Sequence, residues 1–292
     1  MQENNDRGPV FSDYLSLVKF RLSLAVAFSA ATGYLVYNSC TRFDFILLIS
    51  GIFLLTCGSA ALNQYTEREQ DAIMKRTMHR PVASKRISAG SAVTISAVLI
   101  ITGCLLLLST GLNPFILGCC GIILYNLIYT CLKKVSPLAL IPGAMVGSVP
   151  PLIGYASAGG TALNDKILFF TAFMFIWQIP HFWLLLMSYG KEYQDAGFKT
   201  IYDHMNYRQI RILTLSWIVF WSLILVLFAY YAGVFISFFT IILFSLTAVF
   251  IVLFLVFLFS GNGDKGLKYS FALLNLYSFF IMVILIADSL MK

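Results

Sequence analysis

The sequence predicts an all-α integral membrane protein with nine transmembrane helices. Of its 292 residues, 59% are hydrophobic and only 11% are charged, so the chain has too little polar surface to cover a soluble globule of this size. Apolar runs long enough to cross a hydrocarbon layer of roughly 30 Å recur along nearly the whole chain, which favours helices over barrel strands. The predicted spans are 14–37, 45–65, 91–109, 113–131, 138–157, 166–188, 209–231, 234–259 and 267–289.

The basic residues predict how these spans are oriented. Seventeen of the twenty Lys and Arg residues fall on one side of the predicted membrane, and the other side has only Arg42, Lys166 and Lys292. Because loops rich in Lys and Arg stay in the cytoplasm, the N-terminus is expected inside and the C-terminus in the periplasm. The net charge of +7 is therefore a topology signal and does not call for nucleic acid as a partner. About a dozen polar residues precede the first span, too few for a transit peptide, so a bacterial inner membrane is expected.

The chain is expected to form a single transmembrane domain, 1–292. Its longest segments outside the predicted spans are 64–90 and 189–208, and both lie on the cytoplasmic side. The six cysteines lie in or beside apolar spans without C-x-x-C spacing, which is typical of small buried side chains rather than of a disulfide or zinc framework. Both long segments carry acidic clusters, so any chemistry is expected at the cytoplasmic face.

The first acidic cluster is Asn63, Glu67 and Asp71, spaced four residues apart where an apolar span meets a basic segment. In a continued helix this spacing places one amide and two carboxylates on a single face, about 6 Å apart per step. Mg²⁺ prefers hard oxygen ligands and usually takes one or two carboxylates, leaving its other positions to water and phosphate oxygens. We therefore expect a catalytic site in which Glu67 and Asp71 bind Mg²⁺ and Asn63 orients it. The alternative is a solvated helix end with ion pairs such as Asp71 to Lys75.

The second acidic cluster is Glu192 and Asp195, at the end of the sixth predicted span. These two carboxylates are three residues apart and can hold a second metal ion, or they can belong to an ordinary polar loop. Basic residues around both clusters are candidates for neutralising a diphosphate, although Lys133 and Lys134 also fit a topology role. The basic candidates are Arg76, Arg80, Lys133, Lys134 and Lys191.

The sixth span carries polar residues in its middle, in the segment from Trp177 to Trp183. An ionisable residue within a membrane span is a functional hypothesis, because inserting it is costly. Trp177, Gln178 and His181 are therefore expected to face a substrate, with the aromatic rings forming a flat apolar wall; the alternative is a histidine bonded to a neighbouring helix. Within the fifth span, the segment from Gly143 to Gly154 combines small residues with two prolines, which either widens a central pocket or only aids helix packing.

The chain resembles the UbiA superfamily of intramembrane prenyltransferases, and more narrowly its heme-farnesylating branch, over about residues 14–290. The resemblance implies a nine-helix bundle around a central cavity, with two aspartate-rich motifs on cytoplasmic loops. Glu67 stands where the family usually has Asp, a longer ligand with the same charge. The matching segments are Lys19–Leu24, Asn63–Pro81, Tyr129–Lys134, Gly147–Gly154 and Trp177–Trp183.

The resemblance implies transfer of a farnesyl group from farnesyl diphosphate to a vinyl group of heme B, giving heme O, with Mg²⁺ assisting departure of the diphosphate. It also implies that Arg76, Arg80 and Lys191 contact the diphosphate while His181 faces the porphyrin. Membrane lipid would surround the bundle, and heme A synthase or terminal oxidase assembly proteins are the implied partners.

Three other functions fit parts of the pattern. One is a UbiA-type enzyme acting on an aromatic quinone precursor such as hydroxybenzoate or a naphthoate, against which the Trp177–Trp183 segment argues. Another is a membrane transporter, in which His181 and the broken fifth span would form a substrate path. The third is a structural subunit of a respiratory complex, which gives no reason for two acidic clusters on one face.

Overall fold

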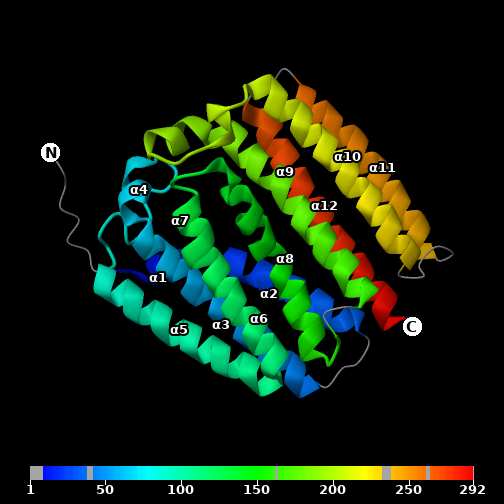
Figure 1. Ribbon diagram of the computed structural model, residues 1–292, viewed down its shortest axis with the longest axis horizontal. Helices are drawn as coiled ribbons and strands as arrows, with labels where there is room; N and C mark the ends of the chain where they lie inside the picture. The colour runs from blue at the N-terminus through cyan, green and yellow to red at the C-terminus, as the bar shows by residue number, and fades with distance from the viewer. Residues whose placement is uncertain (1–8, 38–41, 162–163, 232–237, 261–263, 292) are drawn as a thin grey trace.

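The computed structural model describes residues 9–37, 42–161, 164–231, 238–260 and 264–291, and every regular element in these ranges is a helix (Figure 1). The long elements confirm the predicted all-α class. The helices are α1 (Phe11–Leu17), α2 (Phe20–Val36), α3 (Arg42–Thr66), α4 (Arg68–Ile73), α5 (Ala89–Thr110), α6 (Leu112–Ile122), the π-helix η1 (Ile123–Tyr129), α7 (Thr130–Leu132), the 3₁₀ helix η2 (Pro137–Ala139), α8 (Leu140–Ser157), α9 (Asp165–Asp195), the 3₁₀ helix η3 (Ile201–Asp203), α10 (Tyr207–Tyr231), α11 (Phe238–Phe259) and α12 (Asp264–Leu290).

The described residues contain eight helical segments that are long and apolar enough to cross a membrane, and nine if α1 and α2 count as one bent span. This agrees with a multi-pass protein of nine spans. The first span is not the continuous helix expected over 14–37, because α1 and α2 meet at an angle of 47°. Lys19 lies in this break with a φ of 46°, a left-handed conformation that is rare for a residue other than glycine. The eighth predicted span begins at residues 234–237, which lie outside the described ranges.

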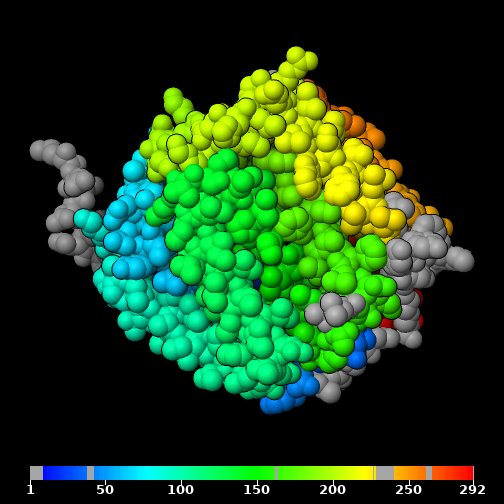
Figure 2. All heavy atoms as spheres, in the orientation of Figure 1, coloured from blue at the N-terminus to red at the C-terminus, as the bar shows by residue number. Residues whose placement is uncertain are grey.

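The helices pack into a closed bundle. α3 packs against α5 and α2, α2 packs against α8, and α8 packs against α9. α12 contacts both α9 and α2, which closes the ring, while α10 and α11 flank α9 and α12 on the outside (Figure 1). Side chains fill the gaps between neighbouring ribbons over most of the face shown in Figure 2.

Two glycines allow α2 and α8 to approach closely. A Cβ atom added to Gly154 would lie 1.9 Å from the carbonyl oxygen of Ala30, and one added to Gly33 would lie 1.9 Å from that of Pro151. Since both obstacles are backbone atoms, neither contact can be relieved by a side-chain rotation. The small residue Gly154 of the fifth span therefore serves packing, whereas Gly143 and Gly147 line a cavity inside the bundle. The helix α8 continues through Pro150 and Pro151 without a break.

Two helix ends differ from expectation. The acidic ladder does not lie on one continued helix, because α3 ends at Thr66 and α4 begins at Arg68. The sixth span was expected to end near residue 188, but α9 continues to Asp195, so the second acidic cluster lies on its last turns rather than in a loop.

Candidate active site

A cavity of about 430 Å³ lies inside the bundle and is lined mainly by α2, α3, α6, η1, α8 and α9. One end is charged and the other is largely apolar. The charged side chains in its lining are Lys19, Glu67, Asp71, Arg76, Arg80 and Lys133. The volume is in the range of roughly 300–1,000 Å³ that is usual for small-molecule sites.

The first acidic cluster lies on one side of this cavity despite the interruption of the helix. Glu67 has a non-helical backbone, but its N–H still donates to the Asn63 carbonyl at 3.0 Å, and the N–H of Asp71 donates to the Glu67 carbonyl at 2.8 Å. These two bonds preserve the helical register across the break, so the three side chains remain on one face as predicted. Asn63, Glu67 and Asp71 are only 2%, 5% and 3% exposed, and all three line the cavity. This burial argues against a solvated helix end.

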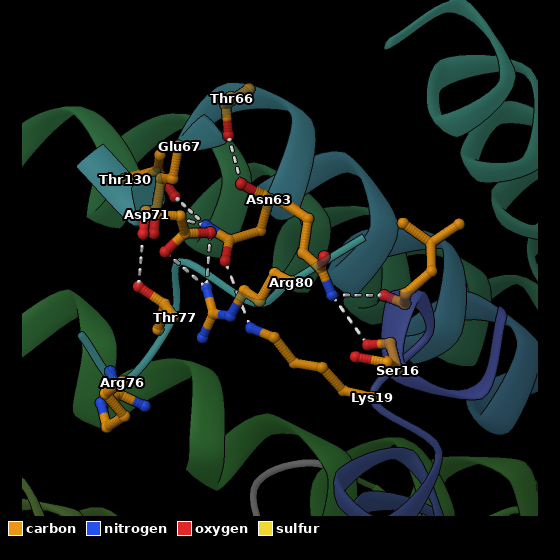
Figure 3. A network of polar contacts seen from close by, with 12 residues as sticks. Ser16, Lys19, Asn63, Thr66, Glu67, Asp71, Arg76, Thr77, Arg80 and Thr130 are labelled. Atoms are coloured by element: carbon orange, nitrogen blue, oxygen red, sulfur yellow. Dashed lines mark hydrogen bonds and ion pairs between the residues drawn. The ribbon is translucent and has the colours of Figure 1, made fainter. Parts of the chain in front are cut away.

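Basic side chains hold both carboxylates of the cluster. Arg80 donates from Nη1 to both oxygens of Asp71 at 2.8 Å, as Figure 3 shows. Lys133 forms an ion pair with Glu67, and Asn63 donates from Nδ2 to Glu67 Oε1 at 2.5 Å. The alternative of a solvated helix end implied a pair between Asp71 and Lys75, whereas the described partner of Asp71 is Arg80.

Burial and the neighbouring charges have opposite effects on the pKa values of Glu67 and Lys133. Burial raises the pKa of the Glu67 carboxyl, but the Lys133 ammonium together with Lys19 and the Asn63 amide outweighs it, so the pKa lies below its usual value. Burial lowers the pKa of Lys133, and the Glu67 charge opposes that shift. We therefore expect Glu67 to stay ionised only while its basic neighbours are present.

Lys19 is a cavity residue that the site prediction did not include. Its Nζ donates to Asn63 Oδ1 and to the Tyr125 hydroxyl, both at 3.3 Å, and Figure 3 shows it pointing toward the acidic cluster. Its position depends on the break between α1 and α2, which no glycine or proline in the sequence marks. Tyr125 and Tyr129 also line the cavity, and their rings stack at 5.8 Å on the π-helix η1. A π-helical turn often occurs at functional sites, but nothing in the sequence of this segment signals it.

The second acidic cluster is not part of the cavity lining. Glu192 Oε2 accepts the backbone N–H of Arg76 at 3.1 Å, and Asp195 is exposed. Arg76 itself lines the cavity, and its Nη2 donates to the Tyr193 hydroxyl at 3.0 Å. Glu192 thus joins the end of α9 to the segment that follows α4, and α4 lies beside the C-terminal end of α9 in Figure 1. Among the described residues, no three His, Cys, Asp or Glu side chains come together as a metal-binding group.

The remaining predicted residues divide between the cavity and its surroundings. Gln178 and His181 line the cavity, whereas Trp177, Lys134 and Lys191 are not in its lining. His181 Nδ1 lies 3.1 Å from Asn275 Oδ1 on α12, so this histidine both lines the cavity and bonds to a neighbouring helix. Lys191 is exposed. The roles expected for the whole set in metal and substrate binding stay predictions.

Comparison with known proteins identifies the family. The model of the UbiA prenyltransferase family matches residues 22–283, which is most of the chain. The chain belongs to the UbiA prenyltransferase family. A relative of this UbiA-family prenyltransferase, named protoheme IX farnesyltransferase in Cytophaga hutchinsonii, is 38% identical over 195 residues, which are 65% of this chain and 68% of that protein. The matched stretch therefore covers about two thirds of each protein.

Solved structures share the fold of this UbiA-family prenyltransferase. A UbiA homologue from Aeropyrum pernix K1 matches with a TM-score of 0.76 at 16% identity, covering 90% of this chain and 98% of that one. A UbiA homologue from Archaeoglobus fulgidus, solved with GPP and Mg²⁺ bound, matches with a TM-score of 0.64 at 13% identity, covering 95% and 98%. These likenesses confirm the predicted UbiA-type helical bundle.

Proposed function

We propose that this prenyltransferase transfers the farnesyl group of farnesyl diphosphate to a vinyl group of heme B, giving heme O. The bond from farnesyl C1 to the diphosphate oxygen breaks, and C1 joins the terminal vinyl carbon. Water then adds to the inner vinyl carbon and loses a proton, which leaves a hydroxyethyl group and free diphosphate. The name of the Cytophaga relative supports this choice of substrates.

The observation that carries the proposal is a single cavity with a charged end and an apolar end. Glu67, Asp71 and Lys133 line one part of it, while Gln178, His181 and Phe182 line another. A diphosphate fits the basic end and an isoprenoid or porphyrin fits the apolar walls, so a charged group and an apolar group can lie next to each other in one cavity. Excluding water from that space protects an allylic cation until the acceptor has reacted.

The acidic cluster fits Mg²⁺ by the chemistry of its donors. Asn63, Glu67 and Asp71 offer an amide oxygen and two carboxylates on one buried face, the hard oxygens that this ion prefers. The Archaeoglobus homologue solved with GPP and Mg²⁺ supports this assignment. When bound, Mg²⁺ would act as a Lewis acid that neutralises charge developing on the leaving diphosphate.

The basic side chains of the cavity bind and orient the diphosphate in this proposal. Arg80 and Lys133 already lie beside the carboxylates, and Arg76 is held by Tyr193 at the cavity lining. A guanidinium offers two parallel N–H donors to phosphate oxygens, so Arg76 and Arg80 fix orientation as well as charge. The Glu192 side chain accepts the backbone N–H of Arg76, and we propose that it positions Arg76 rather than binding a metal.

The proposed setting is a bacterial inner membrane with the charged end of the cavity at the cytoplasmic face. The positive-inside distribution of Lys and Arg supports this orientation, with the N-terminus cytoplasmic and the C-terminus periplasmic. Heme A synthase and terminal oxidase assembly proteins are the expected partners, because heme O must be handed on within the membrane.

The direct test is to incubate purified protein in nanodiscs with farnesyl diphosphate, Mg²⁺ and heme B, and to measure heme O by mass and free diphosphate by a coupled assay. Heme O is expected, with one diphosphate released for each product. Parallel reactions replace heme B with hydroxybenzoate or a dihydroxynaphthoate. Prenylation of either aromatic acid without heme O would show that the acceptor is wrong, and solute movement in liposomes without diphosphate release would indicate a transporter.

Lys133→Gln is expected to raise the KM for farnesyl diphosphate roughly ten- to hundredfold, since a hydrogen bond to a charged group contributes about 1.5–3 kcal/mol. Removing this ammonium also raises the pKa of Glu67, so the acidic limb of the pH–rate profile should move to higher pH. The matched control is Lys134→Gln, because this neighbour is not in the cavity lining. Equal effects of the two variants would contradict the assignment of Lys133.

A further inference from the structure

His181 has a hydrogen-bond partner that determines the tautomer of its imidazole as well as its position. Its Nδ1 lies 3.1 Å from Oδ1 of Asn275, on the neighbouring helix α12. The amide of Asn275 is itself oriented, because its Nδ2 donates to the carbonyl oxygen of Phe271 at 2.5 Å. Turning the amide over would place two acceptor oxygens against each other at that distance. Asn275 therefore presents its oxygen to His181.

An oxygen acceptor at Nδ1 determines the tautomer of the imidazole. Nδ1 must carry the proton in order to donate to Asn275 Oδ1, so in the neutral ring Nε2 keeps its lone pair. Without such a partner, a histidine in an apolar setting can carry its proton on either nitrogen. Asn275 thus selects one of the two neutral tautomers of His181.

The ring is held so that Nε2 is the nitrogen left for a ligand. The rings of Trp177 and Phe271 lie 5.0 and 4.7 Å from the imidazole centroid, and the side chain lines the cavity. Asn275 is not in the cavity lining and occupies Nδ1 from outside it. The hydrogen bond described for His181 is made by Nδ1, and none is described for Nε2 within the described ranges.

We propose that Asn275 is a positioning residue that holds His181 as its Nδ1–H tautomer, so that Nε2 can ligate the iron of the porphyrin acceptor. The identity of that acceptor rests on the proposed function. Histidines that bind a metal almost always donate their other ring N–H to an oxygen acceptor, which orients the ring and raises its basicity. His181 and Asn275 have this arrangement, and the apolar wall beside them suits a flat macrocycle. Iron ligation at this point would fix where the porphyrin lies relative to the charged end.

The binding experiment compares heme B with metal-free protoporphyrin IX, measured by visible absorption in nanodiscs. Asn275→Leu is expected to weaken heme binding roughly 10–100-fold, the usual cost of losing a partner behind a metal ligand. It should leave the affinity for metal-free protoporphyrin unchanged, because no iron is there to be ligated. Asn275→Asp keeps an oxygen acceptor and should bind heme more tightly than Asn275→Leu. The matched control is Ser278→Ala, a buried position on the same helix whose hydroxyl has no partner among the described residues.

A second readout follows the tautomer itself. The chain has three histidines, so long-range ¹⁵N–¹H correlation spectra of ¹⁵N-histidine-labelled protein give three ring systems, and His181→Gln assigns one of them. The parent is expected to show His181 protonated at Nδ1, and Asn275→Leu to lose that preference.

The outcomes separate this inference from the proposed function. Protonation at Nε2 in the parent, equal loss of both porphyrins, or no loss of heme binding in Asn275→Leu would overturn the inference. Failure of the parent to bind heme B would overturn it as well. If the parent binds heme with this dependence on Asn275 but forms no heme O, the proposed reaction fails while the assignment of Asn275 stands.

Discussion

Asp71→Asn is expected to lower kcat/KM for farnesyl transfer at least about a hundredfold. Metal Lewis acidity contributes several kcal/mol to stabilising charge on a leaving group, and each 1.36 kcal/mol corresponds to a factor of ten. Asp71 is 3% exposed and lines the cavity, so its neutral amide would remove one of two carboxylates from the proposed metal site. Release of diphosphate should fall in parallel with formation of heme O. Added Mg²⁺ should restore only part of the activity.

The matched control for Asp71→Asn is Glu69→Gln, on the same short helix. The side chain of Glu69 is 78% exposed, and within the described ranges its one ion pair is with Arg68 at 3.5 Å, so its substitution should leave the rate nearly unchanged. Because Asp71 also pairs with Arg80, the variant is compared with the parent for thermal stability in the same nanodiscs. A stable Asp71→Asn protein with parental activity would contradict the metal site.

Gly154→Ala is expected to destabilise the bundle by about 3 kcal/mol, at the upper end of the cost of overpacking. The added methyl group would lie 1.9 Å from the carbonyl oxygen of Ala30, so α2 and α8 must move apart. Since both helices line the cavity, activity should fall together with the apparent melting temperature. The measurement is thermal unfolding followed by loss of monodisperse protein.

Gly121→Ala is the control for this substitution. Its added methyl group would lie 3.8 Å from the nearest atom, a side-chain carbon of Val149, which is an ordinary contact. The control should melt close to the parent temperature. If Gly154→Ala were as stable as Gly121→Ala, the close approach of α2 and α8 would not exist as described.

Much of the fold could be predicted from hydropathy, because a span in lipid must satisfy its own backbone and therefore forms a long apolar helix. The details that were missed depend on tertiary contacts. The break at Lys19 carries no glycine or proline. The helix α9 continues beyond the predicted end of its span, where Glu192 on its last turns accepts the backbone N–H of Arg76.

The part of the candidate site that lies on one helix face, the first acidic cluster, could be predicted from the sequence. The four-residue spacing of Asn63, Glu67 and Asp71 survives the end of α3 through two backbone hydrogen bonds, so local periodicity was enough. Lys19 lies in the break between α1 and α2 and Asn275 lies on α12, so their distances to the site depend on how the bundle closes. Asp195 shows the converse, since its spacing from Glu192 suggested a shared site although it is exposed.

The ion pairs of the acidic cluster imply that Mg²⁺ and farnesyl diphosphate bind cooperatively. Arg80 holds both oxygens of Asp71, and Lys133 holds Glu67, so each carboxylate is committed to a protein cation. If the carboxylates turn toward a divalent ion, Arg80 and Lys133 lose their anionic partners. The diphosphate can replace the carboxylates as the partner of these two cations. We therefore expect thermodynamic linkage, in which farnesyl diphosphate tightens the affinity for Mg²⁺ by the same factor as Mg²⁺ tightens the affinity for farnesyl diphosphate. This exchange of ion-pair partners would prevent farnesyl diphosphate from ionising too early, because neither Mg²⁺ nor farnesyl diphosphate alone provides new partners for both the carboxylates and the basic residues.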